Sequence, residues 1–434
     1  MEDFAQALNI GIPFFTILIF IEILVAYIQK KQVVNLPDMV SSLSSGITNI
    51  TKDVLGLLIA IISYDWIETN FALFDLKVQW WMFPVVFVAK DFSGYWIHRF
   101  EHKVNYFWNR HVVHHSSEEY NLSVALRQSI SEIFSLTIFI LFPLAVLGIP
   151  VQVFAVVAPI HLFSQFWYHT RLINRMGVLE KIIVTPSHHR VHHAINPEYI
   201  DKNFSLIFIV WDKLFGTFQE ELASIPAVYG VKKPVHTWNP IIINFQHAGR
   251  IWLDFFRTSS WKDKARIWFM PTGWRPADVA VKYPIQIISD PQQQVKYMPE
   301  LDRGIKVWSF VQLVVTLSSA IFLFNCLALI GPSIALLIGA FIFLAVYSYT
   351  TVMDGKKYGL WMEITKSVIA LLGIRYFTLL IEFNQIQLIF LSIIFVYHAI
   401  SGVVAFTFLA RKKEIIVVYQ QNQQESFDES KLKI

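Results

Sequence analysis

The chain of 434 residues is unusually apolar, with 55% hydrophobic, 15% aromatic and only 16% charged residues. This balance excludes an ordinary soluble domain and indicates an integral membrane protein. The net charge of +4 is small and the basic residues are dispersed, so the sequence predicts no nucleic-acid partner. The single cysteine, Cys326, excludes a disulfide within the chain and a cysteine-based metal site.

Apolar stretches recur along the chain at close to the ~20 residues that a spanning helix needs. Six of them come near that length: 10–28, 80–97, 307–330, 332–349, 360–381 and 386–409. Residues 131–148 and 151–167 predict a hairpin of two helices that turns at Ile149-Pro150, and the shorter stretch 54–66 predicts a tilted or re-entrant helix. We therefore expect an all-α integral membrane protein with about nine transmembrane or membrane-embedded helices.

Charge and hydropathy predict four regions. These are an N-terminal membrane block (1–168), a cytosolic or interfacial cap (169–304), a C-terminal block of four membrane helices (305–410) and a cytosolic tail (411–434). Basic residues follow several spans, whereas Glu2 and Asp3 precede the first, which favours a cytosolic C-terminus and a cytosolic histidine-rich cap. The membrane is then the bacterial inner membrane or the endoplasmic reticulum.

Histidines are concentrated in one part of the chain. Thirteen of the fourteen lie between His98 and His247. His98 and His102 are spaced i and i+4, so on a helix their rings share one face and can bind one ion. His111 reaches both His114 and His115, which point about 100° apart and can therefore serve two different ions.

A third set of histidines repeats this spacing and completes the predicted metal site. We predict nine metal ligands: His98, His102, His111, His114, His115, His169, His189, His192 and His193. Imidazole alone does not select the metal, but an all-imidazole dinuclear site at a membrane edge favours two iron ions that activate O2. A zinc hydrolase that uses Asp91 or Glu101 remains an alternative.

Asp91, Tyr95, His98 and His102 share one helical face by their spacing of four, three and four. We predict that Asp91 and Tyr95 belong to the catalytic site, Asp91 as an acceptor that orients an imidazole. The remaining histidines have other expected roles. His161 and His398 are expected in the core, His236 and His247 in or on the cap, and His188 beside the ligands without binding metal.

The histidine spacings resemble those of the fatty acid hydroxylase and sterol desaturase superfamily over about residues 80–220. Within it, the stretches HHSSEEYNLSVALRQS (114–129), TPSHHRVHH (185–193) and DKNFSLIFIVWDKLFGTF (201–218) are most similar to the alkylglycerol monooxygenase family. The resemblance implies a di-iron monooxygenase that uses tetrahydrobiopterin and O2 to cleave the ether bond of a lipid. One position departs from the pattern, since Lys103 follows His102 where the animal enzymes have glutamate.

Two other functions are consistent with parts of the pattern. A sterol, fatty-acid or carotenoid hydroxylase or desaturase would use the same metal site but take electrons from a redox protein, a ferredoxin or cytochrome. A membrane metal transporter would instead place ionisable ligands along a path near the bilayer midplane. Apart from His161 and His398, the predicted spans lack histidine at that depth, which favours the oxygenase.

Overall fold

The computed structural model describes residues 2–57, 59–131 and 137–410. Within these ranges all regular secondary structure is helical, and extended pairing is confined to isolated bridges such as that of Val104 with Pro271. The prediction of an all-helical chain is therefore confirmed for the part that the structure describes. The predicted tail, residues 411–434, lies outside it, as do residues 132–136 of the predicted hairpin.

The chain divides into two compact units. The first comprises Ala7–Val235 and Ile241–Val295, and the second comprises Glu2–Gln6, His236–Pro240 and the chain from Lys296 onward. The helices up to residue 125 are α1 (Glu2–Ile28), α2 (Leu36–Lys52), α3 (Ile59–Phe71), α4 (Met82–Lys103), α5 (Asn105–His115) and α6 (Leu122–Ala125). They are followed by α7 (Thr137–Val146), α8 (Val151–Phe163), α9 (Pro186–His193), α10 (Val210–Leu214), α11 (Pro240–Arg257), α12 (Trp261–Arg266) and α13 (Ala277–Lys282). The second unit contains α14 (Arg303–Met353), α15 (Lys357–Leu380) and α16 (Gln385–Ala410).

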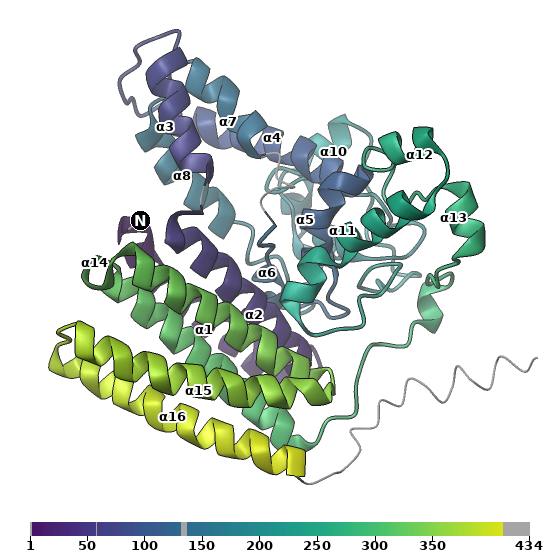
Figure 1. The fold of residues 1–434 in the computed structure, drawn as a ribbon. Coiled ribbons are helices and arrows are strands. Elements are labelled where there is room, and N and C mark those ends of the chain that lie inside the picture. Colours follow the sequence, from purple (N-terminus) through teal and green to yellow (C-terminus); the bar gives the residue numbers. More distant parts are fainter. Residues whose placement is uncertain (1, 58, 132–136, 411–434) are drawn as a thin grey trace, which may run out of the picture. The chain divides into compact units, whose positions relative to one another are not determined.

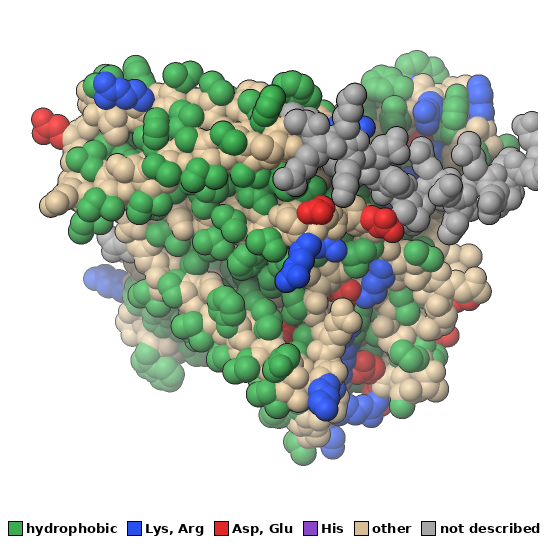
Figure 2. Space-filling view, turned by 90° about the horizontal axis from the view of Figure 1, so that it is seen from below, with side chains coloured by type: hydrophobic (Ala, Val, Ile, Leu, Met, Phe, Trp, Pro, Cys, Tyr) green, Lys and Arg blue, Asp and Glu red, His purple; other side chains and the backbone are tan. Residues whose placement is uncertain are grey.

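Three of the described helical segments are long and apolar enough to cross a membrane: Leu8–Ile28, Arg303–Met353 and Gln385–Phe408. Many of their large apolar side chains are exposed. Figure 2 shows abundant hydrophobic side chains at the surface, with charged side chains scattered among them. Exposed apolar surface on this scale is suited to lipid rather than to water. The count of nine membrane helices and the cytosolic position of the cap remain predictions.

The helices of the second unit pack as long, closely aligned rods, with α15 against both α14 and α16 (Figure 1). Helix α14 is interrupted at Gly331, whose backbone has a positive φ of 70°, directly before Pro332. Proline has no amide hydrogen to continue the helical ladder, and glycine adopts this conformation without strain. The interruption falls between the predicted segments 307–330 and 332–349.

The region around α3, α7 and α8 shows how turns set the helix boundaries of the first unit. Tyr64 of α3 and Phe154 of α8 stack in a shared apolar core, and the Tyr64 hydroxyl donates to the carbonyl of Ile149, 2.8 Å away. Gly148, in the turn between α7 and α8, has a φ of 76°, and a side chain there would collide with the Phe74 carbonyl. Another positive-φ glycine, Gly56, marks a kink before α3, inside the shorter predicted segment 54–66.

The junction of α4 and α5 brings the first two histidine pairs together. Val104 adopts an extended conformation (φ −125°, ψ 125°), which ends α4 and redirects the chain into α5. The next residue, Asn105, is held by residues 267–270. Its backbone amide donates to Met270 O at 3.0 Å, and its side-chain amide donates to Ile267 O at 3.0 Å. The turn therefore places the last turn of α4 beside α5.

Candidate metal centre

All nine histidines predicted as ligands lie together, in two groups. The first group has five members: His98 and His102 from α4, His111 and His115 from α5, and His192 from α9. The second has four: His114 from α5, His169 from the segment after α8, and His189 and His193 from α9. Within each group, one nitrogen of every ring lies within 4.8 Å of the others, which is the spacing needed to share a metal ion.

The Nε2 atoms point inward in both groups. In the five-histidine group, His111 Nε2 lies 2.8 Å from His98 Nε2 and 3.1 Å from His115 Nε2. In the four-histidine group, His189 Nε2 lies 3.0 Å from His169 Nε2 and 3.1 Å from His193 Nε2. Two further inward atoms, His102 Nε2 and His192 Nε2, are buried without a hydrogen-bond partner among the described residues. Converging lone pairs of this kind are suited to binding a cation.

In four of the nine histidines the outer ring nitrogen faces a backbone carbonyl, which fixes the tautomer of those rings. His98 Nδ1 donates to Phe204 O at 2.6 Å, and His192 Nδ1 donates to Lys202 O at 3.0 Å. In the other group, His114 Nδ1 donates to Arg127 O at 3.2 Å and His169 Nδ1 to Gln165 O at 3.0 Å. A proton held on Nδ1 leaves the Nε2 lone pair free for a metal, as histidine ligands require.

A carboxylate supports one ring of the five-histidine group. Glu101 is almost fully buried, and its Oε2 lies 3.3 Å from His111 Nδ1, while its Oε1 accepts from Arg110 at 2.8 Å. Glu101 is therefore positioned to orient His111 from outside the group. The metal-spaced groups among the described residues contain only histidine.

The two groups are adjacent. His115 of the first and His193 of the second stack with ring centroids 4.3 Å apart, and His192 of the first stacks on His189 of the second at 5.1 Å. Aromatic rings surround them, with Trp108 against His102 at 5.1 Å, Tyr168 against His189 at 4.4 Å and Tyr120 against His193 at 5.2 Å. The arrangement fits two neighbouring ions in a site that is largely closed to water.

Burial controls the charge of the rings. It lowers the pKa of all nine histidines, to about 3 for His98 and about 4 for His114. Neighbouring histidines lower the pKa of most of these rings further, because a second positive charge nearby is unfavourable. The rings are therefore neutral at pH 7, the form that binds a transition metal.

Asp91 orients a histidine, but one outside both groups. Its Oδ1 lies 3.0 Å from His161 Nε2, and it also accepts from the amides of Ile207 and Phe208 and from Trp211 Nε1 at 2.8 Å. Asp91 thus ties α4 to α8 and to the segment before α10. A role of Asp91 in the catalytic site remains a prediction.

Tyr95 is fully buried one turn before His98. Its hydroxyl lies 2.9 Å from Thr217 Oγ1, and Arg99 donates to it at 3.1 Å. The ring packs on Phe215 and Phe204, and Phe204 is the residue whose carbonyl holds His98. Tyr95 therefore supports the wall of the five-histidine group, and its participation in catalysis remains a prediction.

The other histidines lie apart from the two groups. His188 Nδ1 accepts from the Thr185 amide at 3.4 Å, which caps the start of α9. His398 is buried between helices of the second unit, and His236 stacks on Tyr297. His247 lies on α11. The sequence did not identify Lys202, Phe204 and Arg127 as supports, because they act through backbone carbonyls, which carry no side-chain signal.

Comparison with known proteins follows this geometry. Residues 83–217, which include all nine histidines, match the fatty acid hydroxylase family. Alkylglycerol monooxygenase from Homo sapiens is 36% identical over 380 residues, covering 87% of this chain and 84% of that protein. The enzyme of the same name from Xenopus tropicalis is 33% identical over 381 residues, covering 87% and 84%. This chain belongs to the alkylglycerol monooxygenase family.

Similarity to a second kind of lipid enzyme is shorter. Ornithine lipid hydroxylase OlsE from Rhizobium tropici is 31% identical over 144 residues, which is 32% of this chain and 43% of that protein. No solved structure matches the chain significantly. Membership in the alkylglycerol monooxygenase family thus rests on similarity that extends well beyond the histidine-bearing region.

Proposed function

We propose that this chain is a membrane-bound monooxygenase that hydroxylates a C–H bond of a lipid at two iron ions. The observation that carries the proposal is the pair of adjacent histidine groups, five rings and four, with their Nε2 atoms directed inward. Members of its family are named for alkylglycerols, so the most specific form is hydroxylation of the carbon beside an ether oxygen. The resulting hemiacetal then separates into a fatty aldehyde and glycerol.

The residues of the chain would serve this chemistry in three ways. The neutral imidazoles would hold the metal, and two iron ions bound there would supply the activation of O2. The carbonyls of Lys202, Phe204 and Arg127 keep the rings in the metal-binding tautomer. The surrounding rings of Trp108 and Tyr120 limit the access of water, which would otherwise compete with the substrate for the oxidant.

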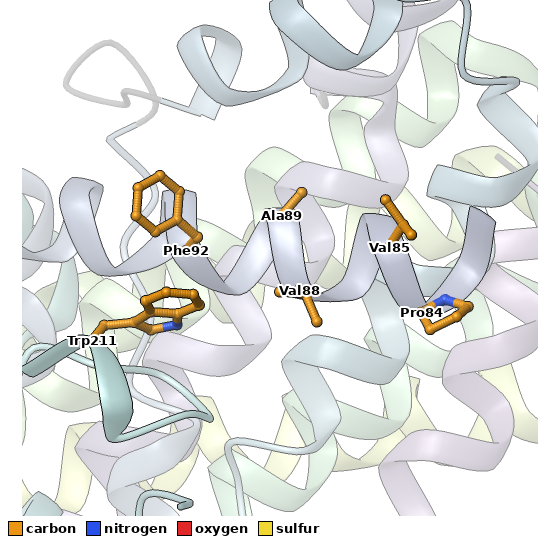
Figure 3. A pocket seen from close by; sticks show the side chains of 6 residues that line it. All are labelled: Pro84, Val85, Val88, Ala89, Phe92 and Trp211. Atoms are coloured by element: carbon orange, nitrogen blue, oxygen red, sulfur yellow. The ribbon is translucent and has the colours of Figure 1, made fainter. Parts of the chain in front are cut away.

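An apolar groove along α4 is a candidate site for the alkyl chain of the substrate. It has a volume of about 570 Å³ and is lined by Pro84, Val85, Val88, Ala89, Phe92 and Trp211 (Figure 3). The rings of Phe92 and Trp211 are in contact at one end of this row, with centroids 5.1 Å apart. Phe92 precedes His98 on α4 by about 9 Å of helix rise, at 1.5 Å per residue. An apolar wall of this kind suits a lipid chain drawn from the bilayer.

The electron donor distinguishes the two forms of the proposal. Hydroxylation places one oxygen atom of O2 in the product and reduces the other to water, which takes two electrons and two protons from a donor. A reduced pterin, tetrahydrobiopterin, is the donor that the family resemblance implies. The broader alternative is a lipid hydroxylase that takes electrons from a ferredoxin or cytochrome. The similarity to an ornithine lipid hydroxylase supports lipid hydroxylation in general and does not bear on the donor.

The experiment that tests the proposal is a product analysis with purified protein in lipid. The protein is incubated with an alkylglycerol and O2, in parallel with reduced pterin and with a reduced ferredoxin. We expect fatty aldehyde with pterin and none after removal of the metal by a chelator. Aldehyde with ferredoxin alone would support the broader hydroxylase, and formation of a fatty alcohol without O2 uptake would indicate a hydrolase instead.

A further inference from the structure

One short segment supports three of the five rings in the first group. His98 and His192 donate to the carbonyls of Phe204 and Lys202, at 2.6 and 3.0 Å. The outer nitrogen of a third ring, His102 Nδ1, lies 4.0 Å from Asp201 Oδ1. Residues 201–204 therefore face the outer nitrogens of histidines from both α4 and α9.

The backbone of this segment has an uncommon conformation. Asp201 and Asn203 have φ values of 59° and 55°, in the left-handed region that few residues other than glycine adopt, although aspartate and asparagine tolerate it best. Such a conformation persists only where surrounding contacts enforce it, and it is concentrated at functional sites. The position of the two carbonyls therefore depends on what holds the segment at each end.

The C-terminal end is held by buried hydrogen bonds. The Asn203 side chain donates to His188 O at 3.0 Å and accepts from the Gln219 amide at 2.8 Å. The Asp212 carboxylate accepts from the amides of Phe204 and Ser205, at 2.8 and 2.7 Å. These bonds fix Phe204 firmly beside His98.

The N-terminal end is held by an ion pair to α4. Lys103 Nζ donates to Asp201 Oδ2 at 2.6 Å, and Lys103 directly follows His102. The two side chains are 46% and 31% exposed, and an ion pair with that exposure contributes little to folding stability. The contact does join the helix that supplies His98 and His102 to the segment that orients their outer nitrogens.

We propose that Lys103 and Asp201 form a clamp that positions the segment 201–204, and through it His98, His102 and His192, for metal binding. The clamp rests on the proposed metal function of the two histidine groups. Lys103 and Asp201 are positioning residues, because they act through the rings and backbone of the five-histidine group. The same pair gives a role to the lysine that directly follows His102. A lysine side chain cannot accept a hydrogen bond, but it can donate one to the carboxylate of Asp201.

The test is a measurement of metal affinity at each group. Lys103→Met and Asp201→Asn each remove one charge, and asparagine retains the tolerance of aspartate for a positive φ. We expect each variant to bind one ion about 10- to 100-fold more weakly in chelator competition, as is typical when a support of a metal ligand is lost. The second ion, in the four-histidine group, should bind as in the wild type.

Three comparisons separate positioning from a general loss of structure. Lys103→Arg keeps the ion pair with Asp201 and should retain the wild-type affinity for metal. The double variant of Lys103→Met and Asp201→Asn should bind the ion no more weakly than Asp201→Asn alone, because Lys103 acts through Asp201. Lys213→Ala is the matched control, since Lys213 is also an exposed cation of this region but donates to the carbonyls of Glu180 and Lys181.

Substitution of cobalt gives a readout that is independent of turnover. We expect the absorption bands of cobalt in the five-histidine group to shift in Lys103→Met and Asp201→Asn and to be unchanged in Lys213→Ala. Wild-type affinity and spectra in both charge-removal variants would overturn the clamp while leaving the proposed function intact. A wild-type protein that binds no transition metal would overturn both.

Discussion

His114 and His115 are consecutive in the chain, yet their rings belong to different histidine groups. Their ring planes are 88° apart, with centroids separated by 5.5 Å. His115 Nε2 lies 3.1 Å from His111 Nε2, whereas His114 Nε2 lies 3.3 Å from His169 Nε2. Two adjacent positions on α5 can thus be used to distinguish the two proposed ions.

Removing either ring should remove one ion. We expect His114→Ala and His115→Ala to lower the metal content from about two ions per chain to about one, measured by elemental analysis of purified protein. Activity should fall by at least about 100-fold in both, since the proposed chemistry uses both ions. His188→Ala is the control for a histidine of the same region, because His188 caps α9 and does not join either group. Full metal content in both ligand variants would refute the two-group assignment.

If the groove on α4 holds the alkyl chain of the substrate, a substitution that fills it should change the substrate preference. Val88 lies in the row that lines the groove, and Val88→Trp should fill part of its volume of about 570 Å³. We expect KM for a long-chain lipid to rise several-fold, with a smaller effect on a short-chain analogue, because only the long chain would extend along the groove.

A matched valine tests whether this effect is specific. Val311 of α14 has nearly the same exposure, 42% against 43% for Val88, but does not line the groove. Val311→Trp should leave KM for both substrates unchanged. Equal effects of the two substitutions would show that the groove does not select the chain.

Much of the histidine arrangement followed from local spacing. The i and i+4 pairs on α4, α5 and α9 place rings on one face before any tertiary contact is known. The interruption of α14 at Gly331 followed from a glycine and a proline between two apolar stretches. These features are set within about one helical turn, which is why they could be predicted.

Partners distant in the sequence could not be predicted in this way. Asp91 was expected to orient an imidazole, but the spacing could not reveal that the ring would be His161, 70 residues away. The ion pair of Lys103 joins it to Asp201 across 98 residues. A helical face can be derived from the sequence, whereas the element that packs on it requires the tertiary structure.

The second unit contains a buried ion pair whose loss should be costly. Lys366 and Glu363 are both almost fully buried on α15, with Nζ and Oε2 2.7 Å apart, and Lys366 also donates to Gln312 of α14. We expect Lys366→Met to lower the free energy of unfolding by about 3–5 kcal/mol, because it leaves the Glu363 carboxylate buried and unpaired. Thermal or denaturant unfolding in detergent measures the change.

Two further variants determine the origin of that loss. Lys366→Met combined with Glu363→Leu should recover much of the stability, since neither buried charge remains. Lys357→Met, at an exposed lysine of the same helix, should change the stability by less than about 0.5 kcal/mol. A double variant no more stable than Lys366→Met would mean that the pair acts through packing alone.

His247 on α11 should make the folded first unit less stable as the pH falls. Burial, and next the charge of Arg250, lower the pKa of His247 from 6.5 to about 4. The unfolded chain then binds more protons than the folded one between these values. The contribution of His247 to stability is complete above pH 6.5 and is lost as the pH falls toward about 4, with an upper limit of about 3 kcal/mol.

Replacing His247 with a neutral residue of similar size should remove its pH-dependent contribution to stability. The unfolding midpoint of His247→Gln should fall less steeply than that of the wild type between pH 6.5 and 4, and the two proteins should differ little in slope above pH 7. Parallel curves over the whole range would contradict a neutral His247 in the folded protein.

The most direct test of the central claim is simultaneous measurement of O2 uptake and fatty aldehyde from an alkylglycerol, with reduced pterin as the donor. We predict substrate-dependent uptake with about one aldehyde formed for each O2 consumed, and loss of both in His114→Ala and His115→Ala. Metal-loaded wild-type protein that neither consumes O2 nor forms an oxidised lipid, with pterin or with a reduced ferredoxin, would contradict a lipid monooxygenase.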